Sequence, residues 1–213
     1  MGEKVLKAVN VAINDANTSH EKSLALFSFG FDVGSSSVSV RIEKMDDSFG
    51  SPTLDEITLF GRLFNDHLGS GVGEDVAEDI SIEVSSPGAE RELRVPEDLE
   101  RFAHLPMRVR FSVSLGGDGQ GEGSGSSVET LLKKAKTKRK KSNDDDVMSF
   151  EAILMFVDAA QGKTKWEFVE CRSNEKLLGR KVLKQLASNG DEGCGILELE
   201  GHEIVRAALH LEI

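Results

Sequence analysis

The segment from Ser85 to Arg91 combines two hydroxyl groups, a rigid turn and an arginine. Proline followed by glycine is typical of a type II turn, in which proline sets the first central φ and glycine accepts a positive second φ. Such a turn can present serine hydroxyls and backbone amides to a phosphate or a partner chain, and arginine binds phosphate well. Local roles remain open: we favour serines that satisfy backbone amides of the turn, and a salt bridge is as well supported for Arg91 as a phosphate contact. The candidate residues are Ser85, Ser86, Pro87, Gly88 and Arg91.

Seven basic side chains within nine consecutive positions form a second candidate site, here called the basic block. They are Lys133, Lys134, Lys136, Lys138, Arg139, Lys140 and Lys141. Three interpretations stay open: a solvated loop with no partner, a nuclear-import-like tract, or an electrostatic arm for RNA. In the last case each phosphate contact adds about 0.7–0.9 to the log–log slope of binding against salt, so deleting residues 128–142 should flatten that slope.

No residue pattern typical of an enzyme or a metal site occurs in the sequence. The five histidines are isolated from one another and from Cys171 and Cys194. Two cysteines cannot build a disulfide framework or a four-cysteine zinc site, and H-E-x-x-H, G-x-S-x-G and C-x-x-C motifs are absent. We therefore expect a non-enzymatic protein with no catalytic residue, metal or cofactor. An enzyme whose active-site residues are far apart in the sequence and meet only in the fold remains an alternative.

The charge is divided unevenly along the chain. The 213 residues include 26 Lys and Arg and 37 Asp and Glu, a net charge of −11. Because the basic block contributes +7, the rest carries −11 minus +7, or −18. Residues 116–127 have the glycine–serine composition of a flexible linker, so residues 116–147 are expected to be a long, mostly disordered insertion. No apolar run reaches the roughly 18–20 residues of a membrane span.

Residues 1–96 show the pattern of a small α/β domain. Apolar residues recur at helical spacing over residues 3–14, and Thr53 with Glu56 forms a capping box that starts a second helix, ending at Gly69. Strand-like alternation occurs over residues 24–31, 38–42 and 80–84. The order helix, strand, strand, helix, strand predicts a sheet with helices on one face.

Residues 97–213 read as a second domain. Short strands are expected over residues 107–113, 150–157, 166–169, 196–199 and 205–211. Residues 174–187 are ambiguous, because Gly179 weakens an otherwise helical pattern. Five short strands with one long hairpin insertion predict a small closed barrel, so the fold class of the whole chain is α+β.

The stretch from Ile82 to Arg91 resembles the signature of the ribosome maturation factor RimP family, in which a strand ends in E-V-S-S-P-G and an acidic–arginine pair follows. The sequence of residues 87–91 is most similar to that of the plant, plastid-type branch of the family. The resemblance is strong over residues 38–113 and absent over residues 114–149. It implies an N-terminal α/β domain followed by a C-terminal Sm-like β-barrel. The chain departs from the family at Glu92, where a proline is usual, at Leu105-Pro106, where a glycine is common, and in its long insertion.

The resemblance also implies a function. Such factors are non-enzymatic and bind the immature small ribosomal subunit, where they contact ribosomal RNA and a small-subunit protein. For this chain that implies partner binding at the Ser85–Arg91 segment, with the basic block as an RNA arm and a basic ribosomal protein as electrostatic partner of the acidic domain. The alternative is an Sm-like RNA-binding protein, nuclear if the basic block is an import signal, without a ribosomal role.

The location of the protein is also an expectation. Residues 1–20 contain acidic residues and no arginine, unlike a transit peptide. We expect a monomer without membrane contact, in the chloroplast stroma if the chain is processed from a longer precursor and otherwise in the cytoplasm.

Overall fold

The structure is a computed structural model that describes residues 1–114, 132, 147–188 and 196–210. Its contacts divide the chain into two compact units, Met1–Gly88 and Ala89–Ile213. Both units combine helices with a sheet, which confirms the predicted α+β class. Residues 89–96, which the sequence pattern grouped with the first domain, lie in the second unit.

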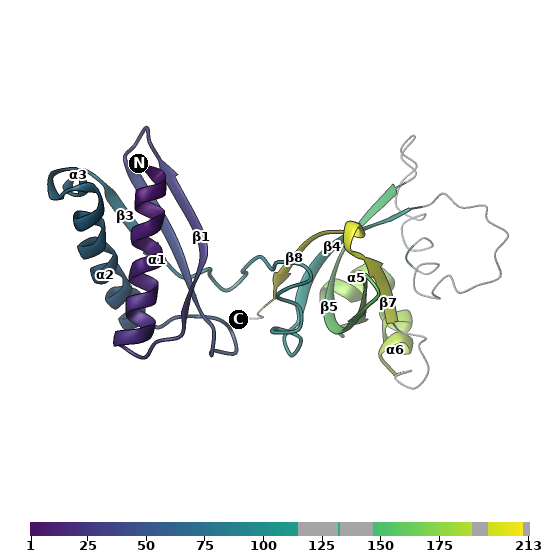
Figure 1. The fold of residues 1–213 in the computed structure, drawn as a ribbon. Coiled ribbons are helices and arrows are strands. Elements are labelled where there is room, and N and C mark those ends of the chain that lie inside the picture. The colour runs from purple at the N-terminus through teal and green to yellow at the C-terminus, as the bar shows by residue number, and fades with distance from the viewer. Residues whose placement is uncertain (115–131, 133–146, 189–195, 211–213) are drawn as a thin grey trace. The chain divides into compact units, whose positions relative to one another are not determined.

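The first unit is a three-stranded sheet with two long helices on one face (Figure 1). Its elements are α1 (Gly2–Ser19), β1 (Leu24–Asp32), β2 (Ser37–Lys44), α2 (Leu54–Val72), α3 (Glu74–Glu78) and β3 (Ser81–Ser85). β2 lies between the other two strands, antiparallel to β1 and parallel to β3. The five-residue helix α3 was not predicted, because a single turn leaves no recurring apolar stripe.

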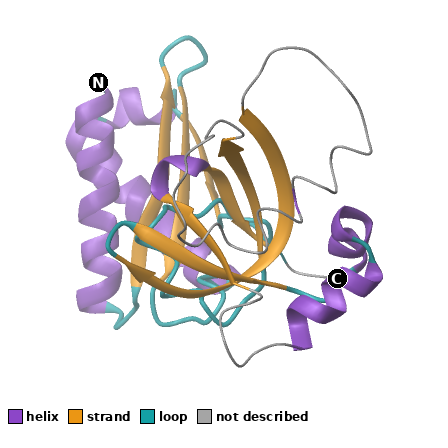
Figure 2. Cartoon of the chain, turned by 90° about the vertical axis from the view of Figure 1, so that its right-hand side faces the viewer, coloured by secondary structure: helices purple, strands orange, loops and turns teal. Residues whose placement is uncertain are grey.

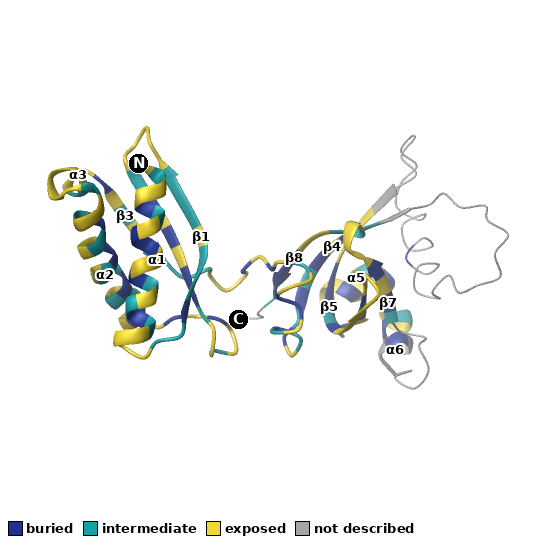
Figure 3. Ribbon diagram, in the orientation of Figure 1, coloured by how far each residue is buried: buried dark blue, intermediate teal, exposed yellow. Residues whose placement is uncertain are grey.

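Apolar stripes on the helices hold this unit together. Phe60, Phe64 and Leu68 of α2 are fully buried and pack in one cluster with Val40 and Ile42 of β2. The buried residues follow lines along α1 and α2, while the opposite faces of both helices are exposed (Figure 3). Burial of these stripes is the main source of stability for the two helices.

The capping box predicted from Thr53 and Glu56 is present at the start of α2. The backbone N–H of Glu56 donates to Thr53 Oγ1 at 3.3 Å, and the backbone N–H of Thr53 donates to Glu56 Oε2 at 2.8 Å. The Lys44 ammonium donates to Glu56 Oε1 at 2.9 Å. Burial alone would raise the pKa of Glu56, but the hydrogen bonds from Thr53 and Lys44 outweigh it and hold the pKa below its ordinary value.

The second unit is built on a curved antiparallel sheet with strand order β7-β6-β5-β4-β8 (Figure 2). The strands are β4 (Met107–Ser114), β5 (Val147–Ala160), β6 (Lys163–Phe168), β7 (Ile196–Glu200) and β8 (Ile204–Leu209). The short 3₁₀ helix η1 (Gly201–Glu203) joins β7 to β8. Two helices, α5 (Arg172–Leu178) and α6 (Arg180–Ser188), contact β5 and β6.

The predicted closed barrel is wrong for the described part of the chain, where β7 and β8 are the two edges of an open sheet. The outer edge of β8 is instead occupied by the segment that precedes the sheet. The backbone N–H of Leu93 donates to the Ala207 carbonyl at 2.8 Å, that of Leu209 donates to the Arg91 carbonyl at 2.9 Å, and Glu92 bridges to Ala208. A strand edge that is already hydrogen bonded cannot also close a barrel.

The ambiguous stretch 174–187 is helical in two pieces, α5 and α6, which break at Gly179. Gly179 has a φ of +89°, which glycine adopts without the steric cost of a Cβ. Within α5, Asn174 is fully buried and clamps the sheet: its Oδ1 accepts from Ile153 N at 3.0 Å, and its Nδ2 donates to the carbonyls of Ile153 at 2.6 Å and Val169 at 2.8 Å.

Most of the predicted insertion 116–147 lies outside the described residues. Leu132 is described, and it is fully buried in the core of the second unit together with Met107, Phe111 and Leu154. This residue of the insertion therefore packs against the sheet. Val147 begins β5.

Candidate functional site

The residues for which a turn is predicted follow directly after β3, where the first unit ends. Ser85 is the last residue of β3 and pairs with Arg41 of β2. Gly88 has a φ of +86°, as the second central position of a type II turn requires, but the turn residues in the structure are the next two, Ala89 and Glu90. Ser85, Ser86 and Pro87 are half-buried and Gly88 is exposed. Partner binding by these residues stays a prediction.

The residues directly after the turn alternate like a strand, in keeping with their pairing to β8. Glu90 and Glu92 are exposed, whereas Arg91 and Leu93 are buried, with 2% and 5% of their surfaces exposed. Successive side chains of an extended segment point to opposite faces. The segment therefore directs an arginine into the second unit and two glutamates away from its core.

Arg91 lies in a buried cluster of charged and aromatic side chains. Its guanidinium carbon is 4.7 Å from the centroid of the Phe102 ring, and that of Arg101 is 4.8 Å from the same ring. Asp98 is buried nearby and accepts from Arg94 Nε and Nη2, both at 3.0 Å. These contacts favour a structural role for Arg91 within the second unit. Its predicted role in partner binding stays a prediction.

The Asp98 carboxyl is held ionised by these arginines. Burial alone would raise the pKa of Asp98, but the hydrogen bonds from Arg94 and the charges of Arg94 and Arg91 outweigh it. The pKa of Asp98 therefore lies below its ordinary value.

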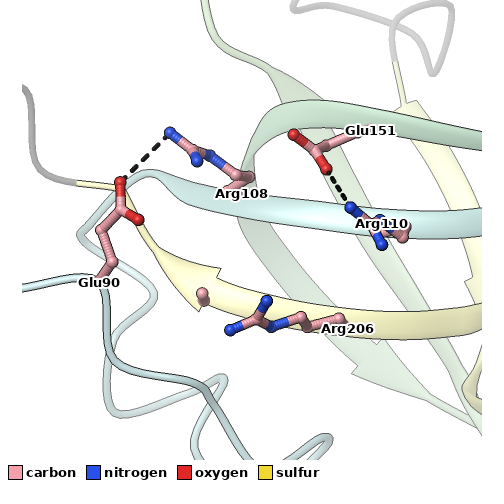
Figure 4. A pocket seen from close by; sticks show the side chains of 6 residues that line it. Glu90, Arg108, Arg110, Glu151 and Arg206 are labelled. Carbon is pink, nitrogen blue, oxygen red and sulfur yellow. Dashed lines mark hydrogen bonds and ion pairs between the residues drawn. The ribbon is translucent and has the colours of Figure 1, made fainter.

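Three other arginines meet on the outer face of the second sheet, and we call them the arginine patch: Arg108, Arg110 and Arg206. Met107, Val109 and Phe111 of β4 are fully buried, so the alternate residues Arg108 and Arg110 point to the opposite face. Arg206 of β8 lies directly opposite Arg110 in the register of the two strands. The patch lines a cavity of about 200 Å³ (Figure 4).

Each arginine of the patch faces one carboxylate, and we call these residues the facing glutamates: Glu90, Glu92 and Glu151. Arg108 Nη2 lies 3.3 Å from Glu90 Oε1, and Arg110 Nη2 lies 3.0 Å from Glu151 Oε2 (Figure 4). Arg206 Nε lies 3.3 Å from Glu92 Oε1. All six side chains are between 39% and 62% exposed, so water screens each pair and each contributes little to stability.

The patch is suited to phosphate rather than to bases. Beside the charged groups, its described lining contains only the small Ala208, with no aromatic ring on which a base could stack. Arg108 Nη2 also lies 3.3 Å from His210 Nδ1. Guanidinium groups that converge on one cavity can bind phosphate oxygens through several N–H groups at once.

The patch was not predicted, although part of its signal is present in the sequence. Arg108 and Arg110 alternate with apolar residues in a predicted strand, which indicates that both arginines face solvent. Arg206 joins them only through the pairing of β4 with β8, whose register depends on residues about a hundred positions apart. The basic block lies outside the described residues, so its RNA-binding role stays a prediction.

The described residues contain no group of three or more His, Cys, Asp or Glu side chains placed to hold a metal ion. Within the same residues, no helix is long and apolar enough to cross a membrane.

The chain is similar to named proteins over part of its length. It is 33% identical over 79 residues to the ribosome maturation factor RimP of Leptospira biflexa serovar Patoc, which is 37% of this chain and 47% of that protein. It is 34% identical over 74 residues to RimP of Leptospira interrogans serovar copenhageni, which is 35% of this chain and 44% of that protein. The chain thus spans about half the length of the curated relatives it matches. No family model matches it.

These distant relatives support the resemblance to the RimP family that the stretch from Ile82 to Arg91 indicates. The similarity to the plant, plastid-type branch stays a prediction, because both relatives are from Leptospira.

Proposed function

We propose that this protein is a ribosome maturation factor of the RimP type, which acts by binding an immature small ribosomal subunit. The observation that carries the proposal is its identity of 33–34% to two proteins of that name. The φ of +86° at Gly88 supports it, because the RimP-like segment has a glycine at a position where other residues would be strained.

The two units suit two different partners. The first unit contains six basic and fifteen acidic side chains, a net charge of −9. Such a surface attracts a basic protein, and small-subunit ribosomal proteins are of this kind. The second unit holds the arginine patch and the basic block, which suit the phosphates of ribosomal RNA. The protein acts by holding these partners together, without catalysis.

We further assign the second unit to the Sm-like class. The support is a strongly curved five-stranded antiparallel sheet in which the last strand, β8, lies beside the first, β4. In this proposal the protein acts as a monomer, in the chloroplast stroma if it is processed from a longer precursor and otherwise in the cytoplasm.

Co-sedimentation tests the proposal. The tagged full-length protein is expected in gradient fractions that contain immature small subunits and to be depleted from fractions of mature ribosomes. Accumulation only in the nucleus, with no protein in the small-subunit fractions, would contradict it and support the Sm-like RNA-binding alternative.

A further inference from the structure

The arginine patch places like charges where a sheet disfavours them. Arg110 and Arg206 are direct cross-strand neighbours, and like charges in such positions repel and destabilise the strand pair. Arg108 follows on the same face of β4, so a third positive charge lies beside the first two. Each arginine has a carboxylate at 3.0–3.3 Å that offsets this repulsion, so the patch holds three anionic groups that the protein itself supplies.

The facing glutamates reach the patch from separate parts of the second unit. Glu90 and Glu92 belong to the segment that pairs with the edge of β8, and Glu151 belongs to β5, opposite Arg110. Each of them offers one carboxylate oxygen to one arginine, at 3.0–3.3 Å. A phosphate oxygen can replace a carboxylate oxygen at a guanidinium, because both are anionic acceptors.

Exposure makes this replacement energetically easy. The carboxylates and the guanidiniums are half exposed, so a displaced glutamate recovers its hydration and only a weak ion pair is lost. The described lining of the cavity offers charged groups without an aromatic platform. A ligand is therefore recognised by its phosphates rather than by its bases.

We propose that the arginine patch binds the phosphate backbone of ribosomal RNA, and that the facing glutamates occupy it as phosphate substitutes until RNA displaces them. This inference rests on the proposed function, which supplies the RNA. The glutamates lower the affinity for RNA at this site and restrict binding to strands that bring several phosphates at once.

The test is a titration of the full-length protein with a labelled oligouridylate of about 12 nucleotides, followed by fluorescence anisotropy. It is repeated between about 0.05 and 0.2 M salt. One variant removes the arginines, and a control removes the same charge from exposed arginines elsewhere. These are R108Q/R110Q/R206Q and the control R62Q/R172Q/R180Q.

Removing the arginines should lower the log–log salt slope by about 2, since each phosphate contact on a single strand contributes about 0.7. The same arithmetic gives an affinity about 100-fold weaker at 0.1 M salt. The control variant should keep the slope of the wild type. Equal slopes for the patch variant and its control would overturn the proposal.

A second variant, which removes the facing glutamates, is the more decisive test. It should increase the affinity for RNA, and misfolding cannot produce such an increase. E90Q/E92Q/E151Q should bind about tenfold more tightly than the wild type, since three weak competing pairs are removed. The control E3Q/E100Q/E198Q, which changes exposed glutamates elsewhere, should gain less than about twofold near 0.15 M salt, where distant charges are screened. Unchanged affinity of the first variant would overturn the role of the glutamates.

The experiments distinguish failure of the phosphate-binding site from failure of the proposed role in ribosome maturation. If the wild type does not bind oligouridylate but co-sediments with immature small subunits, the phosphate site is overturned and the maturation role stands on protein contacts. If it binds oligouridylate as predicted but never co-sediments, the site stands and the maturation role fails.

Discussion

The two units of this protein differ in how their charges are arranged. The first unit is acidic throughout, with fifteen acidic and six basic side chains. The second has twenty-two acidic and twenty basic side chains, a balance of only −2, but its charges are gathered locally. The net charge of −11 therefore does not locate a nucleic-acid contact, because the local field at a surface depends on the grouping of charges.

The units also differ in how polar groups stabilise them. The first unit uses a capping box and an ion pair at the rim of its core, at Thr53, Glu56 and Lys44. The second unit uses Asn174 inside its core, where water cannot replace a lost hydrogen bond. Equivalent polar substitutions should therefore cost the second unit more than the first.

The largest effect is expected for Asn174→Ala. The change leaves the buried N–H and carbonyl of Ile153 and the carbonyl of Val169 without the amide of Asn174, and each lost partner costs about 1–3 kcal/mol. We expect the free energy of unfolding to fall by about 4 kcal/mol. Urea denaturation measures it, with exposed Asn10→Ala in α1 as the control; similar losses in the two variants would refute the contrast between the units.

A smaller effect is expected for Thr53→Ala in the first unit. It removes the hydroxyl that accepts from the Glu56 backbone N–H, and losing such a cap costs about 1 kcal/mol. Replacement with serine should restore most of the stability, because serine caps equally well. A loss of stability as large as that of Asn174→Ala, measured by the same denaturation, would contradict the expectation that polar substitutions cost the second unit more than the first.

The pH dependence of stability offers a third test, at Glu56. Because its pKa is lowered in the folded state, its stabilising contribution is present above the unfolded-state pKa of about 4.5 and is lost as the pH falls through the lowered folded value. Glu56→Gln should therefore cost about 1 kcal/mol at neutral pH and nothing at acid pH. Thermal melting of the wild type and the variant from acid to neutral pH measures this difference in stability. A difference that is constant at all pH values would contradict a stabilising role for the ionised Glu56.

Two glycines of the first unit should give effects of about the same size or smaller, and of opposite sign. Gly88→Ala should destabilise by about 1 kcal/mol, because alanine is strained at its φ of +86°. Gly61→Ala should instead stabilise by about 0.5–1 kcal/mol, since Gly61 lies within α2 and an added methyl group meets no atom within 4 Å. The two midpoints of denaturation should move in opposite directions, and a shift of the same sign would show that the turn tolerates alanine.

Features that depend on neighbouring residues could be predicted from the sequence. Thr53 and Glu56 lie three positions apart, so the helix start follows from local geometry. The positive φ of Gly88 follows in the same way from the residue types Pro87 and Gly88. The alternation of Met107, Val109 and Phe111 likewise predicted a half-buried strand. In these places tertiary packing agrees with the local preference.

Features that depend on the pairing of distant segments could not be predicted from the sequence. The ion pair of Glu90 with Arg108 and the pairing of Arg110 opposite Arg206 require the register of β8 against two other segments. The same pairing is why the closed barrel was wrong, since residues 91–93 take the outer edge of β8. A pattern of alternating residues shows which face a side chain occupies and not which strand lies beside it.

Gradient sedimentation of immature small subunits with added protein, at about 0.1 M salt, tests the central claim most directly. The wild type and R62Q/R172Q/R180Q should both move with the subunits, whereas R108Q/R110Q/R206Q should be largely lost from those fractions. A wild-type protein that stays at the top of the gradient, apart from the subunits, would contradict the account.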